Sequence, residues 1–202
     1  MPMPGRAQRN MTTILLSGPL DEPLTLAEAK SHLRVDHGDE DTLIQSLITS
    51  ARLHVETLTG RVLMTQSWRL VLDDWPRRNI LSIPLGPVQA VGAVRVYEDE
   101  DIVLTIDAAN YLVETSGVPA RLAMRGHKAW PRPGRPFGGI EIDFTAGYGD
   151  NAEDVPASLR QAIRQLVAHW YANREPVGFG AGAVYVPHTV SALITPFRAV
   201  GL

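Results

Sequence analysis

Histidines and carboxylates lie close together near residue 35 and are the first group in the chain that could do chemistry. His32 and His37 flank Asp36, and the acidic run 39–41 follows. Imidazole nitrogens and carboxylate oxygens bind metals, so a metal site is one interpretation. The spacing matches no recognised ligand pattern, including the calcium-binding loop. The end of one helix followed by the acidic start of the next explains the same residues. We therefore predict no metal and no cofactor.

A carboxylate pair in a predicted strand is the second candidate. Glu141 and Asp143 alternate, which places both side chains on one face, as acid–base catalysis would require. Their apolar neighbours Ile140, Ile142 and Phe144 predict that the other face is buried and that this face is solvated. The serines and the six histidines form no nucleophile elbow or recognisable triad. We predict that the chain is not an enzyme, and a small β-rich hydrolase remains as a remote alternative.

Two charged segments and one glycine-rich segment are the remaining candidates for a functional site. The glycines of 178–182 follow a helix without a Lys-Ser/Thr pair, which favours a hinge over a phosphate loop. The segment 115–140 contains basic residues and no acid, and it is predicted to be a contact loop. Solvent, an acidic neighbouring subunit or DNA could face it. Its candidate contact residues are Trp130, Arg132 and Arg135. A predicted hairpin turn carries four acids that could line a channel or remain an ordinary exposed turn: Glu98, Asp99, Glu100 and Asp101.

Composition limits the classes of protein to which the chain can belong. Hydrophobic residues make up 45% of the 202 residues and charged residues 20%, with a net charge of −3. These values predict a soluble globular protein rather than a disordered chain or a strongly basic nucleic-acid binder. Cysteine is absent, which excludes thiol chemistry and disulfides. No stretch approaches the roughly 18 apolar residues of a membrane span, so no membrane partner is predicted.

Helical signals occur at both ends of the chain. Thr25 and Glu28 form a capping-box pattern that predicts a helix over 26–34. An acidic start and apolar residues at helical spacing predict a second helix over 39–59, which ends at Gly60. A third helix is expected to begin near Pro156 and to end near Asn173, with one apolar face.

Between these helices the pattern changes to short apolar runs separated by turn residues, which predicts six or seven antiparallel strands over 62–148. The predicted fold class is therefore α+β, with two N-terminal helices and one C-terminal helix forming a core into which a β region is inserted. The predicted organisation is a flexible arm (1–20), an N-terminal helical part (21–61), a β-rich insertion (62–150), a C-terminal core helix (151–175) and a docking tail (176–202).

The segment 176–197 contains no charged residue and is rich in apolar side chains. Burial of each large apolar side chain is worth about 1.5–3 kcal/mol, so the segment is expected to dock on its own domain or on another chain. A glycine hinge followed by a short strand over 183–186 could add to a sheet edge. The predicted contact residues of the tail are Tyr185, Val186, Pro187, Val190, Leu193, Ile194, Phe197 and Arg198.

Three blocks of sequence together resemble the head-tail connector (adaptor) family of tailed phages and phage-derived gene transfer agents. Residues 23–68 resemble its short helix, acidic break, long helix with a Thr-Gly-Arg turn, and following strand. Residues 144–175 resemble its strand with an aromatic-Gly ending and its Val-Pro helix start, and residues 186–198 resemble its closing segment. The long β region resembles the larger members of the group.

The resemblance implies a non-enzymatic subunit of a homo-oligomeric ring, usually a dodecamer, at the head-tail joint of a virion or gene transfer agent particle. Its implied partners are the portal protein and a stopper or tail-completion protein, and DNA is expected to pass through the ring without sequence-specific binding. Assembly is expected in the cytoplasm of the bacterial host. A stopper or tail-completion protein of the same particle remains the alternative.

Overall fold

The structure, a computed structural model, describes residues 11–173 and 187–198. The chain forms two compact units. The helical unit consists of Pro19–Thr65 with Gly147–Leu202, and the β unit consists of Met1–Gly18 with Gln66–Ala146. In the sequence, most of the β unit lies between α2 and α3 of the helical unit, and the predicted α+β class is confirmed.

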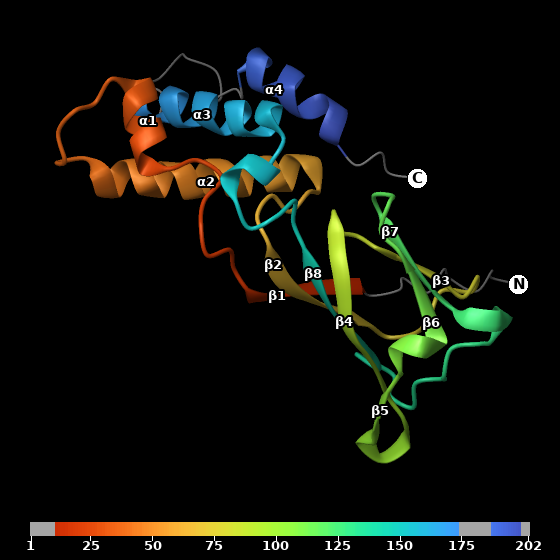
Figure 1. The fold of residues 1–202 in the computed structure, drawn as a ribbon. Helices are drawn as coiled ribbons and strands as arrows, with labels where there is room; N and C mark the ends of the chain where they lie inside the picture. Colours follow the sequence, from red (N-terminus) through yellow and green to blue (C-terminus); the bar gives the residue numbers. More distant parts are fainter. Residues whose placement is uncertain (1–10, 174–186, 199–202) are drawn as a thin grey trace, which may run out of the picture. The chain divides into compact units, whose positions relative to one another are not determined.

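Four α-helices build the helical unit (Figure 1): α1 (Leu26–Leu33), α2 (Asp41–Thr59), α3 (Ala157–Ala172) and α4 (His188–Ile194). The predicted capping box is present, because the Thr25 hydroxyl accepts from the Glu28 amide at 3.2 Å and the Glu28 carboxylate accepts from the Thr25 amide at 3.0 Å. Helix α2 ends at Gly60 in the left-handed region, with φ 66°. The three predicted helices are confirmed, whereas α4 was not predicted. No helix in the described ranges is both long and apolar enough to cross a membrane.

The core of the helical unit follows from helical spacing. On α2 the residues Ile44, Ile48 and Val55 are buried, and on α3 Leu159 and Ile163 are buried. These side chains belong to one cluster that also includes residues of α1, α4 and the segments that connect the helices. The predicted helix faces are therefore those that form the core.

The β unit contains two antiparallel sheets. The five-stranded sheet has the order β1-β2-β8-β4-β5, and its strands are β1 (Met11–Ser17), β2 (Gln66–Leu72), β8 (Ile140–Ala146), β4 (Val88–Tyr97) and β5 (Val103–Thr105). The three-stranded sheet has the order β3-β7-β6, with β3 (Ile80–Ile83), β7 (Ala120–Met124) and β6 (Tyr111–Glu114). Short 3-10 turns occupy Asp99–Asp101, Ala108–Asn110, Arg125–His127, Ala152–Asp154 and Thr195–Phe197.

Seven of these eight strands lie where the sequence predicts them, and β1 is the exception. The prediction of a flexible arm over 1–20 is wrong for Met11–Ser17, because this segment pairs with β2 from Met11↔Leu72 to Ser17↔Ser67. Five of its residues are Thr, Ile or Leu, but the segment lacks the apolar–polar alternation that identifies a half-buried strand. Pairing with a distant strand, rather than its own pattern, fixes its conformation.

Strand register sorts the side chains of the central strands onto two faces. Leu70, Ile142 and Val94 form one buried rung across β2, β8 and β4. The intervening rungs place Arg69 opposite Asp143 and Arg95 opposite Glu141. The alternation of β8 thus supplies both the core and a charged face, as the sequence predicts.

Candidate assembly surfaces

Helix α4 changes the interpretation of the carboxyl-terminal tail. Val190 and Ile194 are fully buried in the core of the helical unit, and Leu193 and Phe197 pack against it. The Arg61 guanidinium donates to the Phe197 carbonyl at 3.0 Å. The assignment of Val190 and Ile194 to a partner-binding surface is therefore wrong, because their side chains are buried in the chain's own core. Leu193 and Phe197 are partly buried, and their role in partner binding stays a prediction. The described part of the segment, from α4 to Phe197, docks on its own unit, which was the first of the two predicted options.

The other predicted tail residues fall into two groups, those outside the described ranges and those outside the core. Tyr185, Val186 and the expected strand over 183–186 lie outside the described residues, as do the glycines of 178–182. Pro187 caps α4, and Arg198 is exposed. The spacing of residues 190, 193, 194 and 197 is that of an amphipathic helix and is the signal that could have predicted α4.

Shortening Ile194 tests whether α4 belongs to the core. Ile194→Ala is expected to lower the free energy of unfolding by about 2–4 kcal/mol, because it opens a cavity at a fully buried site. The matched control is Thr189→Ala on the exposed side of the same helix, expected to change stability by less than about 0.5 kcal/mol. Urea denaturation followed by circular dichroism measures both. Equal effects of the two variants would show that α4 does not pack as described.

The carboxylate pair on β8 is engaged in ion pairs. The Arg69 guanidinium contacts Asp143 at 2.6 Å and Glu141 at 3.1 Å, and Arg95 contacts Asp143 at 2.7 Å. The hydrogen bond from Arg69 is the main cause that lowers the pKa of Asp143, against the opposing effect of partial burial, and Arg95 lowers it further. A carboxylate such as Asp143, whose pKa two arginines lower, suits a structural face and not a general acid, whose pKa must be raised.

The depressed pKa of Asp143 predicts a pH dependence of stability. The stabilisation is fully present above the ordinary pKa of 3.8 and is lost as the pH falls through the lower folded-state value. Asp143→Asn is expected to lower the free energy of unfolding at pH 7 by about 1 kcal/mol, and the difference from the parent should shrink below pH 4. Exposed Asp150→Asn serves as the control. A pH-independent difference from the parent would contradict the assignment.

The predicted contact loop is anchored by a pair of tryptophans. Trp75 and Trp130 stack with their ring centroids 4.1 Å apart and their planes 10° apart. The Trp75 indole donates to the Pro131 carbonyl at 2.8 Å, and the Trp130 indole donates to the Asn79 carbonyl at 3.0 Å. Trp130 is buried, so its prediction as a protruding contact residue is wrong. These contacts, which we call the clamp, fix the loop to the segment before β3.

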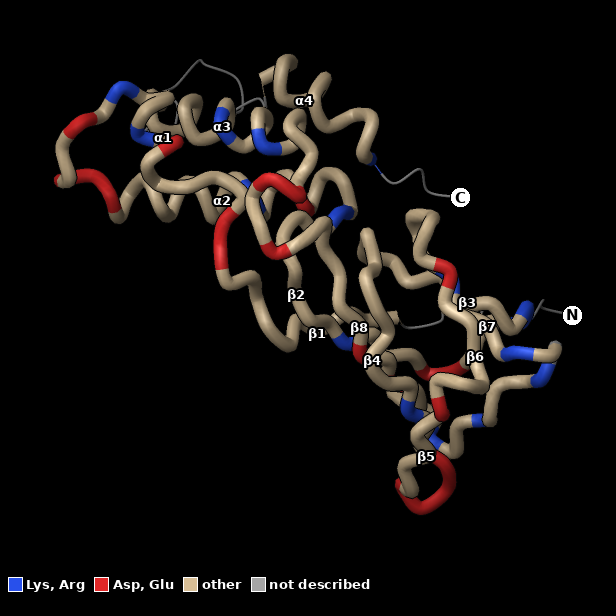
Figure 2. The backbone as a smooth tube through the Cα atoms, in the orientation of Figure 1, with Lys and Arg blue, Asp and Glu red and all other residues tan. Residues whose placement is uncertain are grey.

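The clamp joins two loops that each carry exposed cations. Arg77 and Arg78 lie in the loop before β3, and Lys128 and Arg132 lie in the loop after β7. Figure 2 shows Lys and Arg segments of the tube beside β3 and β7. The sequence identified only the second of these loops as basic. The first lies some 50 residues earlier, and the tryptophan contacts bring the two loops together.

The acidic turn 98–101 is exposed and forms the loop of red tube at β5 in Figure 2. All four acids are exposed, and Asp101 also forms an ion pair with Arg135. The Arg135 guanidinium also lies 3.8 Å from the centre of the Tyr97 ring. Arg135 thus anchors the turn within its own unit, while Arg132 stays exposed.

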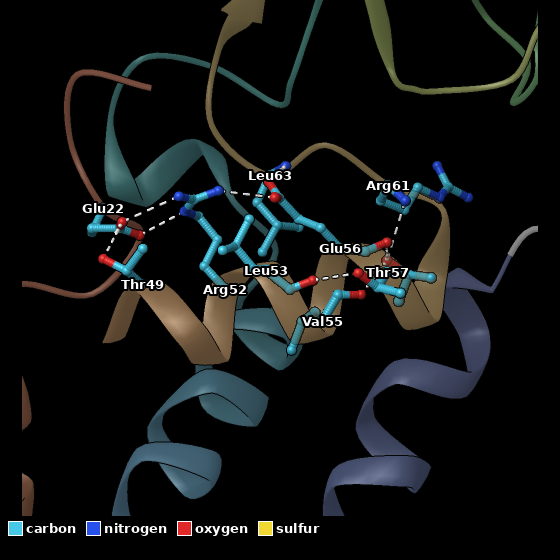
Figure 3. Close-up of polar contacts among 10 residues, drawn as sticks. Glu22, Thr49, Arg52, Leu53, Val55, Glu56, Thr57, Arg61 and Leu63 are labelled. Atoms are coloured by element: carbon cyan, nitrogen blue, oxygen red, sulfur yellow. Dashed lines mark hydrogen bonds and ion pairs between the residues drawn. The ribbon is translucent and has the colours of Figure 1, made fainter. Parts of the chain in front are cut away.

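A buried ion network in the helical unit was not predicted (Figure 3). Arg52 of α2 donates to the Glu22 carboxylate at 2.7 Å and to Glu56 at 2.9 Å. Glu56 also accepts from the Leu63 amide at 2.9 Å, and Thr49 donates to Glu22 at 2.9 Å. Burial alone would lower the pKa of Arg52, but its bond to Glu22 and the charges of both glutamates raise it. The sequence signal was the opposite charges of Arg52 and Glu56 four residues apart on one helix.

The residues near position 35 serve helix ends. Helix α1 ends before Arg34 in the left-handed conformation, and α2 begins at Asp41, whose carboxylate contacts Lys30 at 2.6 Å. Within the described ranges, no group of three or more histidines, cysteines or acids is placed to hold a metal ion. The helix-end interpretation of these residues is therefore the one that their contacts support.

Both edges of the five-stranded sheet expose apolar side chains. On β1 the side chains of Ile14, Leu15 and Leu16 are 47–48% exposed. On β5 and the residue before it, Ile102, Val103 and Leu104 are 58%, 47% and 37% exposed. Exposed apolar residues grouped on strand edges mark surfaces where another protein binds. The ion-paired carboxylates and the exposed apolar edges fit a structural subunit.

Comparison with known proteins gives the particular family. A family model described as "Phage gp6-like head-tail connector protein" matches residues 23–111 and 98–198. The chain belongs to this head-tail connector family. No match is found among curated proteins.

Solved structures of gene transfer agent (GTA) particles contain similar chains. A chain from "Neck of empty GTA particle computed with C6 symmetry" is 28% identical, with a TM-score of 0.80 over 95% of this chain and 97% of that chain. A chain from "Virion of native gene transfer agent (GTA) particle" is 28% identical, with a TM-score of 0.80 and coverages of 94% and 96%. A chain from "Neck of native GTA particle computed with C12 symmetry" is 28% identical, with a TM-score of 0.78 and coverages of 95% and 97%. The family and these neighbours are structural particle proteins, and this chain is a structural connector subunit.

Proposed function

We propose that the chain forms a ring of twelve copies at the head-tail joint of a phage-type particle, between the portal and a stopper or tail-completion protein, and that the genome passes through this ring. The observation that carries the proposal is the 28% identity over 95% of the chain to a neck protein solved in a symmetric particle. A ring needs a contact between two different patches of the same subunit, which the open sheet edges could supply.

We assign the portal contact to the predicted tail residues that are not part of the core. Tyr185, Val186, Pro187 and Arg198 are proposed to bind the portal, because the buried residues of α4 serve the fold. Deletion of 176–202 is therefore an unsuitable test, since it also removes Val190 and Ile194 from the core. Point substitutions separate binding from folding.

Mass measurement of the purified chain, alone and mixed with the portal of the same particle, tests the proposal. We expect a complex of one portal with twelve copies, and we expect Tyr185→Ala with Val186→Ala to weaken portal binding at least tenfold. Thr189→Ala on α4 is the control and should bind as the parent does. A monomer that binds no portal, or cross-linking to the tail side alone, would contradict a connector position.

The acidic turn is proposed to face the channel. Repulsion between Glu98, Asp99 and Glu100 and the DNA phosphates would keep a moving duplex from binding the wall, since each phosphate contact by a cation adds affinity. Reversing these three charges to lysine is expected to slow DNA release from assembled particles. Reversal of Asp21, Asp150 and Glu153 in the helical unit is the matched control. Unchanged release by the turn variant would place the turn away from the DNA.

A further inference from the structure

The five-stranded sheet ends in two strands, β1 and β5, whose residues are all uncharged and include no proline. Edge strands commonly carry charged residues or proline, which prevent pairing with another chain. β1, with the sequence MTTILLS, and β5, with the sequence VLT, contain neither. The only irregularity of β1 among its described pairs is a shift in register between Leu15 and Ser17. Among the described residues, no further strand pairs with the outer edge of β1 or of β5.

The backbone of β5 shows which groups such an addition would use. The Glu98 backbone amide donates to the Ile102 carbonyl at 2.8 Å, and the Ile106 backbone amide donates to the Val94 carbonyl at 2.8 Å. In an antiparallel ladder the residues that face the partner strand alternate, so Leu104, paired with Val96, directs its backbone groups to β4. The N–H and C=O groups of Val103 and Thr105 therefore point to the free edge.

Strand direction decides what kind of contact the two edges can make. All neighbouring strands from β1 to β5 are antiparallel, so the first and the last strand of the five run in the same direction. A ring repeats one head-to-tail contact, so edge strands that run in the same direction would meet in parallel.

We propose that β5 of one copy pairs in parallel with β1 of the next copy, so that the sheets join around the ring. The inference rests on the proposed ring and deepens it by naming the contact between copies. The two edges are different patches of one subunit, and their pairing is head-to-tail, as ring closure requires. Pairing of like edges about a twofold axis would be antiparallel and would stop at a dimer. The exposed side chains of Leu15 and Val103 would then pack beside their cross-strand neighbours.

Cysteine pairs test the contact without background, because the chain contains no cysteine. Ile14 and Leu15 point to opposite faces of β1, and Val103 and Leu104 point to opposite faces of β5. Four double variants, each with one cysteine from each strand, cover both faces. They are oxidised in rings assembled by the full-length chain, alone or on the portal, and separated on a denaturing non-reducing gel. Cβ atoms must approach to about 3.5–4.5 Å for a disulfide to form.

We expect at least one double variant to give a covalent ladder that extends beyond the dimer, and each single variant to remain uncrosslinked. Covalent dimers of a single variant would show like edges meeting and would overturn the proposal. Intact rings without a ladder in any double variant would overturn it too, while leaving the connector function in place. Failure of the parent chain to form rings with or without portal would instead count against the proposed function.

Adding charged residues to the two edge strands tests the same contact by a second route. Leu15→Lys with Val103→Lys is expected to raise the concentration needed for half-assembly at least tenfold, while the monomer keeps its circular dichroism spectrum. Leu53→Lys makes the same chemical change at a residue 51% exposed on α2 and is the control. Assembly of the edge variant at the parent's concentration would overturn the proposal.

Discussion

Replacing Arg52 by alanine is expected to lower the free energy of unfolding by about 3–5 kcal/mol, the cost of breaking a buried ion pair. The Arg52 side chain is 7% exposed, and that of Glu56 is 12% exposed. Without the guanidinium, both glutamates lose their cation, and the segment from Glu22 to α2 loses its anchor. Urea denaturation followed by circular dichroism measures the change.

Variants with a neutralised network distinguish the effect of the lost charge on stability from the effect of the lost packing. Arg52→Met keeps much of the apolar stem and should still cost several kcal/mol, about as much as alanine. Adding Glu22→Gln and Glu56→Gln to Arg52→Met should recover a large part of that loss, because no unpaired carboxylate remains. Leu53→Ala, at the exposed neighbouring position, should change stability by about 0.5 kcal/mol or less. A triple variant no more stable than Arg52→Met would show that packing, and not charge, carries the effect.

Replacing Trp130 by alanine is expected to cost a similar amount in the β unit, about 3–5 kcal/mol. The residue is 6% exposed, stacks on Trp75 and donates a hydrogen bond to the Asn79 carbonyl. Its loss leaves a cavity and frees the two basic loops from one another. Hydrogen exchange should therefore rise in both loops, 73–79 and 125–133, and a denaturant titration should show the lower stability.

Two further variants specify the origin of that effect. Trp130→Phe keeps an aromatic ring but loses the indole donor, and about 1 kcal/mol of the loss is expected from the missing hydrogen bond. Phe137→Ala, 76% exposed in the same connection between β7 and β8, should be nearly neutral. If exchange rose in the loop of Trp130 alone, the two loops would not be clamped to each other.

Local signals in the sequence accounted for most of the elements. The capping box of Thr25 and Glu28 and the glycine at position 60 fixed helix boundaries, since both act through bonds within a few residues. The alternation of β8 identified its buried and charged faces in the same way. Arg69 and Arg95, which pair with its carboxylates, were beyond reach because they come from strands 74 and 48 residues away in sequence.

For the carboxyl-terminal tail, composition correctly predicted that apolar side chains are buried, but the surface predicted to bury them was wrong. An uncharged apolar segment must be buried, but burial energy does not depend on whose surface covers it. Val190 and Ile194 satisfy the requirement inside their own unit, and the helical spacing that indicated this was present in the sequence. The prediction for β1 failed for a different reason, because it missed an ordered strand. An exposed edge strand has no buried face, so its sequence shows no apolar–polar alternation.

By itself, the sequence determined the α+β class, three helices, seven strands and membership of the head-tail connector family, because propensity, capping and periodicity act over a few residues. Only the tertiary structure decided that β1 is the edge strand of a sheet, that α4 completes a core, that Trp75 clamps Trp130 and that Arg52 holds two glutamates. Each of these depends on pairing between segments far apart in the chain. The free energy of such contacts comes from desolvation and packing, which no short window of sequence contains.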